Sequence, residues 1–214
     1  KTREYRVGMT PAGVRQLVIL GAGLDSFAFR RPATLAGLRV FEVDHPATQG
    51  WKRARLAASG IREPVDLEFV ECDFEATSVS AALRASSFRP GEPAIVSWMG
   101  VVYYLARETV ERALEELAGL LAPGSAVVLD YQFPLEDLPQ RYRDVFAQQS
   151  AYLQRAGEPQ VNRYRPEELR QAILAAGFAR AELPTREELR RRYFEPLGSS
   201  IPMSERFGMA IAWR

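Results

Sequence analysis

The sequence predicts an α/β protein built on a doubly wound, mostly parallel sheet of seven strands. Five short apolar segments alternate with stretches of helical periodicity, which is the pattern of βαβ units. Each of the five ends in, or next to, a glycine or a carboxylate. The length of 214 residues, 47% of them hydrophobic, suits one domain over residues 1–214. In such sheets a ligand binds at the carboxyl ends of the strands.

The strands are expected in seven places along the chain. Residues 17–20 are continuously apolar and closed by Gly21, as in a strand covered by helices on both faces. The other expected strands are residues 40–44, 67–73, 94–98, 126–130, 178–183 and 207–213.

Helices are expected between these strands. Pro46 suits the first turn of a helix that runs to residue 59 and ends at Gly60. Pro166 opens another helix, which Gly177 ends. Between these two, an apolar stripe at helical spacing predicts a helix closed by a Pro-Gly pair, with the stripe formed by Val110, Leu114, Leu117 and Leu121.

Residues 132–165 interrupt this alternation. The segment is rich in Tyr, Gln and Arg and contains three prolines. An insertion after the fifth strand would lie over the ligand edge of the sheet, so we expect a helical substrate cap. The alternative is a helical hairpin that only packs on the surface.

The charge balance argues against nucleic-acid and membrane partners. There are 28 Lys and Arg against 27 Asp and Glu, without the basic excess that phosphate binding requires. The run from Arg186 to Arg192 mixes both signs and predicts a solvated helix face. No segment approaches the roughly 20 apolar residues that cross a bilayer. The sequence gives no indication of oligomeric state.

A single cysteine, Cys72, excludes an internal disulfide and suits a reducing compartment, so we expect a cytoplasmic protein. Cys72 itself is expected to be a buried apolar residue. The sequence begins at Lys1 rather than Met, without a signal-like segment, which fits a fragment of a longer chain.

The strongest local signal is the turn Gly21-Ala22-Gly23-Leu24-Asp25, directly after the first strand. Glycine lets the backbone turn sharply and approach a ligand closely. A dinucleotide fingerprint requires a third glycine where Ser26 stands. Asp25 would repel a pyrophosphate but attract a cationic group such as the ammonium of a methionine moiety. The turn therefore favours S-adenosylmethionine over a nicotinamide cofactor.

The second signal lies at the end of the second strand. Asp44 follows Gly21 at close to the roughly 20-residue spacing at which a carboxylate binds ribose hydroxyls. Glu42 points to the same face by strand alternation, so it either shares this role or forms a structural ion pair. His45, the only histidine, is expected beside the adenosine rather than as a catalytic base.

The third signal is Asp73-Phe74 after the third strand. The carboxylate can accept a hydrogen bond from the adenine amine, and the ring can cover the base. The alternative is that Asp73 caps the N-terminus of a helix.

Five motifs together resemble the leucine carboxyl methyltransferase family, which includes protein phosphatase carboxyl methyltransferases and many bacterial small-molecule O-methyltransferases. They are QLVILGAGLDSFAFR, VFEVDHPATQGWKR, FVECDF, SWMGVVYYL and APGSAVVLDY, in this order over most of residues 15–131. Similarity is looser in RYRPEELRQAILAAGF and in the closing strand.

The resemblance implies a role for each matched position. Gly21 would contact the methionine part of S-adenosylmethionine, Asp44 its ribose, and Asp73 with Phe74 its adenine. The family commonly has a glutamate where this chain has Met99, which removes a charge near the cofactor. Its cofactor-carboxylate arginine would correspond to Arg3 or Arg6, although their spacing to Gly21 is short.

These features predict an S-adenosylmethionine-dependent O-methyltransferase of secondary metabolism, acting on a carboxylate or hydroxyl of a small acceptor without a metal. Residues expected near that acceptor are Tyr103, Tyr104, Tyr164 and Arg165. No general base is assigned, because a carboxylate acceptor requires none. The alternatives are a protein C-terminal carboxyl methyltransferase, a nicotinamide-dependent oxidoreductase and a non-catalytic cofactor-binding module.

Overall fold

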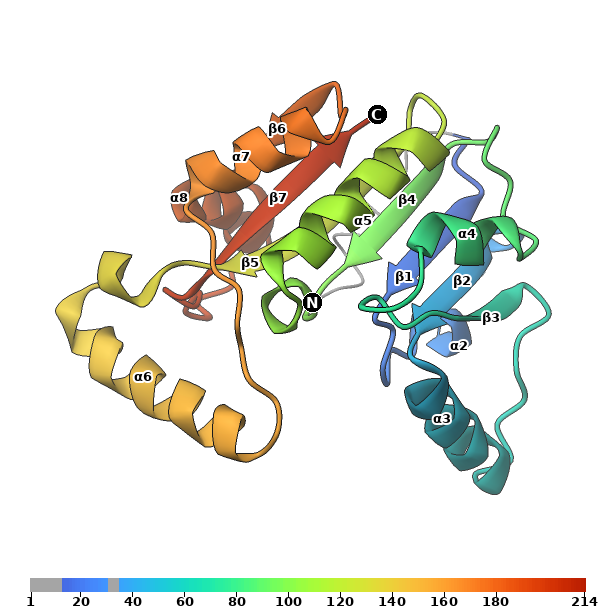
Figure 1. The fold of residues 1–214 in the computed structure, drawn as a ribbon, viewed down its shortest axis with the longest axis horizontal. Helices are drawn as coiled ribbons and strands as arrows, with labels where there is room; N and C mark the ends of the chain where they lie inside the picture. Colours follow the sequence, from blue (N-terminus) through green and yellow to red (C-terminus); the bar gives the residue numbers. More distant parts are fainter. Residues whose placement is uncertain (1–12, 31–34) are drawn as a thin grey trace.

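A computed structural model describes residues 13–30 and 35–214. Its seven strands form one sheet in the order β3-β2-β1-β4-β5-β7-β6 (Figure 1). Only β7 runs antiparallel to its neighbours. The strands are β1 (Gln16–Leu20), β2 (Arg39–Asp44), β3 (Leu67–Glu71), β4 (Ala94–Trp98), β5 (Ala126–Gln132), β6 (Arg180–Glu182) and β7 (Phe207–Trp213).

Helices connect the strands as the apolar periodicity predicts. The α-helices are α2 (Phe27–Arg30), α3 (Pro46–Ala58), α4 (Val79–Arg84), α5 (Arg107–Leu120), α6 (Gln140–Arg155), α7 (Pro166–Ala175) and α8 (Arg186–Leu189). Shorter turns are η2 (Val102–Tyr104), η3 (Leu135–Asp137), η4 (Arg190–Phe194), which has π geometry, and η5 (Glu195–Leu197). None of the helices in the described part of the chain is both long and apolar enough to span a membrane.

The sheet separates two apolar clusters. The larger one joins the sheet to α4, α5 and α7, which lie in front of it in Figure 1. Leu114 and Leu117 of α5 are fully buried there, each stabilising the fold by roughly 2–3 kcal/mol through burial. The smaller cluster includes Phe27 and Ala28 of α2 on the opposite face. The expected doubly wound seven-stranded sheet is therefore confirmed.

The order of the strands reverses between β1 and β4, which lie side by side in parallel. The chain leaves β1 toward β2 and β3 on one side, and leaves β4 toward β5 on the other. A crevice opens at the carboxyl ends of the strands at such a reversal. The loop after β1 and the turn after β4 face each other at this point, which fixes where a ligand site can form.

The segment at residues 132–165 is helical, as expected. It contains η3 and α6, and the chain then continues into α7, which packs on the sheet. Figure 1 shows α6 extending beyond the carboxyl edge of the sheet, on the side opposite α3. No residue of α6 is buried, so this helix does not contribute a buried side chain to either core cluster. Its role as a substrate cap stays a prediction, as does the single domain over residues 1–214.

Two boundaries differ from the expected ones. The third strand ends at Glu71 rather than at Asp73, because the Asp73 carbonyl accepts hydrogen bonds from the Ala76 and Thr77 amides and turns the chain. The sixth strand covers only residues 180–182, a short edge that pairs with β7 alone.

The charged run from residue 186 forms α8 and then the π turn η4. Arg186 pairs with Glu205, and Arg192 with Glu182, so the run lies on the surface with charges of both signs paired.

Candidate active site

The loop after β1 is held in a tight turn by its own backbone. The amides of Gly21 and Ala22 both donate to the Val43 carbonyl, at 2.7 and 3.3 Å, and the Asp25 amide donates to the Ala22 carbonyl at 2.7 Å. Gly21 and Gly23 have φ of 63° and 47°, which side chains with a Cβ rarely adopt. A Cβ on Gly21 would overlap the side chain of Val101, after β4. The glycine spacing is therefore required by geometry.

This loop forms one wall of a cavity at the carboxyl edge of the sheet, which we call the glycine-loop cavity. Its volume is about 540 Å³, within the range typical of small-molecule sites. The lining residues come from the ends of β1 to β4 and from the segment after α6: Gly21, Gly23, Asp44, His45, Thr48, Cys72, Asp73, Phe74, Gly100, Val101, Tyr104, Leu105 and Glu158.

Asp44 is the last residue of β2, and its carboxylate binds the backbone of the loop after β1. Its Oδ2 accepts a hydrogen bond from the Gly23 amide at 2.5 Å, and its Oδ1 accepts one from the His45 amide at 2.7 Å. A carboxylate has about four lone-pair sites, so Asp44 keeps acceptor capacity toward the cavity. The side chain both shapes the turn and remains available to a ligand hydroxyl.

His45, Asp73 and Phe74 line the same cavity, as expected. The His45 side chain caps α3 by accepting from the Ala47 amide at 3.2 Å. Asp73 accepts from the Glu75 amide at 3.0 Å and so caps a turn. The N-cap of α4 is Ser78, so the alternative of Asp73 as a helix cap does not hold.

The cavity is acidic. Asp44, Asp73 and Glu158 line it, whereas no lysine or arginine is among the lining residues identified in the described part of the chain. Cys72 is buried, as expected, and burial raises the pKa of its thiol to about 11. The thiol is therefore neutral at physiological pH, and the lining favours a ligand that carries positive charge.

Glu42 takes the second of its two expected roles. Its side chain is fully buried and forms an ion pair with Lys52 of α3, which is also buried. Burial raises the pKa of Glu42 to about 7, although Lys52 acts in the opposite direction. Glu42 does not reach the cavity, which leaves Asp44 as the acidic residue of β2 that lines it.

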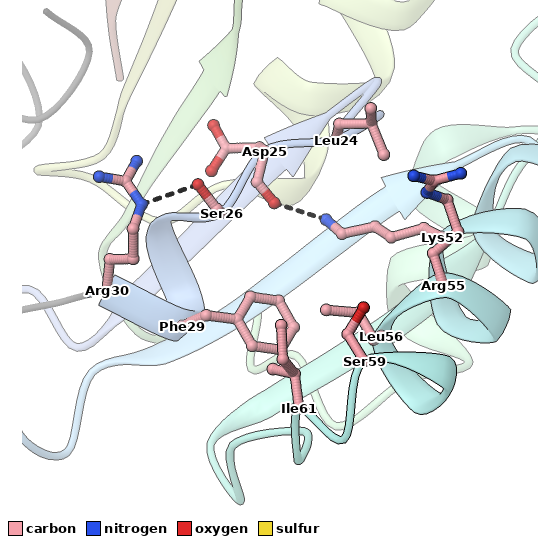
Figure 2. A pocket seen from close by; sticks show the side chains of 10 residues that line it. All are labelled: Leu24, Asp25, Ser26, Phe29, Arg30, Lys52, Arg55, Leu56, Ser59 and Ile61. Carbon is pink, nitrogen blue, oxygen red and sulfur yellow. Dashed lines mark hydrogen bonds between the residues drawn. The ribbon is translucent and has the colours of Figure 1, made fainter.

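Four expected site residues lie next to the glycine-loop cavity without lining it. Ala22 is buried in the smaller core cluster. Asp25 faces the other side of the loop, where it lines a second pocket (Figure 2). Met99 is half-buried in the turn after β4, and Tyr103 is buried between Tyr104 and Phe207.

Tyr164 and Arg165 require a correction, because the structure places neither at the cavity. Tyr164 is 0% exposed, with the Arg107 guanidinium 4.1 Å above its ring centroid. Arg165 pairs on the surface with Asp137, at 2.8 Å, and with Glu136. Both side chains serve packing and surface ion pairs at the start of α7, which sequence spacing alone did not reveal.

Several lining residues were not expected from the sequence as site residues, namely Thr48, Cys72, Gly100, Val101, Leu105 and Glu158. Gly100 has φ of 81°, and its amide donates to the Asp130 carboxylate at 2.7 Å. Burial raises the pKa of Asp130. Gly100 and Val101 belong to the SWMGVVYYL motif, whose glycine could have marked them. Glu158 carries no sequence signal. Arg3 and Arg6 lie outside the described residues.

Glu158 reaches the cavity because backbone bonds fix the segment around it. Its amide donates to the Leu153 carbonyl at 2.9 Å and closes the end of α6. The amides of Val161 and Asn162 both donate to the Tyr103 carbonyl.

Among residues 13–30 and 35–214, no group of three or more His, Cys, Asp or Glu is arranged to hold a metal ion.

Comparison with solved structures identifies the fold of the chain. Human N-acetylserotonin methyltransferase in complex with SAM superimposes with a TM-score of 0.57 at 14% identity, covering 94% of this chain and 47% of that chain. Phosphoethanolamine N-methyltransferase 2 of Haemonchus contortus gives a TM-score of 0.59 at 13% identity, covering 100% of this chain and 51% of that chain. The fold is the Rossmann-like fold of S-adenosylmethionine-dependent methyltransferases.

The sequence identifies the family within this class. The family model described as leucine carboxyl methyltransferase matches residues 3–118. This protein therefore belongs to the leucine carboxyl methyltransferase family.

Two bacterial relatives each match just over half of the chain. YktD of Bacillus subtilis, provisionally named an S-adenosyl-L-methionine-dependent methyltransferase, is 42% identical over 119 residues, covering 56% of this chain and 39% of that protein. A relative from Parafrankia with the same provisional description is 42% identical over 121 residues, covering 56% and 38%. The chain thus spans about two fifths of the length of these relatives.

Proposed function

We propose that this chain binds S-adenosylmethionine in the glycine-loop cavity and transfers its methyl group to an oxygen of a small acceptor. One observation carries the proposal: the glycine turn, Asp44 and the Asp73-Phe74 pair line one cavity at the point where the strand order reverses. The family and the names of the relatives support the same cofactor.

The residues of the cavity fit this cofactor chemically. Gly21 and Gly23 offer backbone without a Cβ to its amino-acid end, and Asp44 offers acceptor oxygens to its ribose. Asp73 and Phe74 offer an acceptor and a ring to its adenine. The acidic lining suits a sulfonium and an ammonium. A pyrophosphate would meet those carboxylates without a basic partner, which disfavours the nicotinamide alternative.

S-adenosylmethionine, when bound, supplies a methyl group already activated on a positively charged sulfur. The protein then has to position the acceptor and exclude water. Tyr104 lines the cavity and is placed to contact an acceptor. Burial raises the pKa of Tyr103 far above neutrality, so its hydroxyl stays protonated and can donate a hydrogen bond but cannot act as a base. A carboxylate acceptor needs no base, whereas a hydroxyl acceptor is helped by one.

Residues 132–165 are proposed as the cap that selects the acceptor, because the segment lies beyond the ligand edge of the sheet and brings Glu158 to the cavity. We further propose a cytoplasmic enzyme that acts on a small molecule rather than on nucleic acid or a membrane. A protein C-terminal carboxyl group is the alternative acceptor that the family suggests.

Calorimetric titration tests the cofactor. We expect micromolar binding of S-adenosylhomocysteine, no binding of NAD, and at least tenfold weaker binding by Asp44→Ala. Asp144→Ala, on the exposed face of α6, is the matched control and should bind normally. Unchanged affinity in Asp44→Ala would remove Asp44 from the site. Binding without turnover on any candidate carboxylate or hydroxyl would favour the non-catalytic alternative.

A further inference from the structure

The glycine turn has a second side, which faces away from the cavity. Leu24, Asp25 and Ser26 line a separate pocket of about 310 Å³ between the turn and α3 (Figure 2). The turn is therefore a thin wall with the cofactor site on one side and this pocket on the other. Because a cavity lies on each side of the turn, its backbone needs contacts from the α3 side to keep its conformation.

Lys52 provides that support. Its side chain extends from α3 across the pocket, and its Nζ donates to the Asp25 carbonyl at 2.6 Å (Figure 2). The side chain is only 5% exposed. The rings of Phe29 and Phe69 lie next to the ammonium group, with their centroids 5.9 and 5.8 Å from Nζ. The ammonium is thus desolvated and fixed in place.

The same ammonium group also forms the buried ion pair with the Glu42 carboxylate. Glu42 and Asp44 are two residues apart on β2, so they lie on the same face of the strand. One face of β2 therefore fixes the turn at two points. Asp44 holds the Gly23 amide directly, and Glu42 holds the Asp25 carbonyl through Lys52.

The energetics of a buried pair favour a positioning role over a stabilising one. Desolvation of two charges consumes most of their attraction, so a well-packed apolar pair is often as stable. The contact that an apolar pair could not replace is the hydrogen bond to the Asp25 carbonyl. The Asp25 amide is already bonded to the Ala22 carbonyl, so Lys52 completes the fixation of both ends of this peptide segment.

We propose that Lys52, held by Glu42, is a positioning residue for the cofactor: by binding the Asp25 carbonyl it keeps the glycine turn in the shape that receives the amino-acid end of S-adenosylmethionine. The inference rests on the proposed function. Lys52 does not line the glycine-loop cavity, so it acts through the backbone of the turn.

The test separates affinity from stability. Binding of S-adenosylhomocysteine and thermal unfolding are measured for wild type, Lys52→Met and the double variant Glu42→Gln/Lys52→Met. We expect Lys52→Met to lose at least tenfold in affinity and also to lose stability, because it leaves the Glu42 carboxyl buried without a partner. The double variant should regain most of that stability yet stay at least fivefold weaker in affinity, because the hydrogen bond from Lys52 to the Asp25 carbonyl is still missing.

Arg186→Met is the matched control. It breaks a half-buried ion pair with Glu205 far from the turn along the chain and should lower stability without changing affinity. Affinity that returns together with stability in the double variant, or normal affinity in Lys52→Met, would overturn the proposal. If Lys52→Met does not fold, the double variant alone decides. Absence of binding in the wild type would instead refute the proposed function.

Discussion

The glycine turn and the 132–165 segment border the same cavity but are held in opposite ways. Backbone hydrogen bonds, the Asp44 carboxylate and the buried Lys52 fix the turn from both sides. The helix α6 has no buried residue. We infer that the turn is a rigid template for the proposed cofactor, whereas the 132–165 segment, the proposed cap, can differ without disturbing it.

One buried side chain connects several parts of the cap. Arg206, just before β7, is 1% exposed. It donates to the side-chain oxygens of Gln132 at 3.0 Å, of Gln149 and Ser150 at 3.0 Å each, and of Gln160. These acceptors belong to the end of β5, to α6 and to the segment between α6 and α7. All four are neutral, so the anchor depends on hydrogen bonds rather than on ion pairs.

The largest effect is expected on the template side, from Gly21→Ala. The added Cβ would overlap Val101, at a position where φ is already 63°. We expect at least a hundredfold loss of S-adenosylhomocysteine affinity in calorimetry. Gly37→Ala is the control, because Gly37 also has a positive φ of 80° but nothing within 4 Å of its Cβ. It should cost about 1 kcal/mol of stability and leave affinity unchanged. Equal behaviour of the two variants would contradict a rigid turn.

An intermediate effect is expected on the cap side, from Arg206→Met. Its four acceptors lose their hydrogen bonds from the Arg206 guanidinium, which should lower the free energy of unfolding by about 2 kcal/mol or more. Limited proteolysis should then cut within α6, while cofactor affinity changes by less than about threefold. If affinity falls as far as in Asp44→Ala, the two regions are not independent.

The smallest effect concerns pH and the support of the turn. The folded-state pKa of Glu42 is raised to about 7 from 4.5, so the folded protein binds more protons than the unfolded chain between these values. The stability that Glu42 contributes is full below pH 4.5 and is lost as pH rises through about 7. The excess in melting temperature of wild type over Glu42→Gln should therefore shrink between pH 5 and 7.5. A constant difference would show that Glu42 does not titrate in this range.

The sequence predicted the template better than the cap for a physical reason. The turn, Asp44 and Asp73 each lie at the end of a strand or within two residues of it, and parallel strands bring their ends together whatever the intervening chain does. Glu158, by contrast, reaches the cavity through the closure of α6 and the bonds of Val161 and Asn162 to the Tyr103 carbonyl. Such contacts between distant segments leave no periodicity or spacing in the sequence.

The same limit explains the misplaced residues. Tyr164 and Arg165 are polar residues of an insertion, which made them plausible substrate contacts. Their burial and their ion pairs depend on how α7 docks, through Arg107 and through Glu136 and Asp137. Only the Glu42 side of the Glu42–Lys52 ion pair could be predicted from the sequence. Strand alternation offered the ion pair as one option, but nothing in the sequence named the partner.

The position of Arg206 has a consequence for the order of assembly. It directly precedes β7, the strand that lies between β5 and β6 and is antiparallel to both. The template needs only β1, β2 and α3, which are made early in synthesis, whereas the cap acquires its anchor only when the closing strand is in place. A nascent chain therefore contains every residue that fixes the glycine turn well before it contains Arg206, which connects the parts of the 132–165 segment.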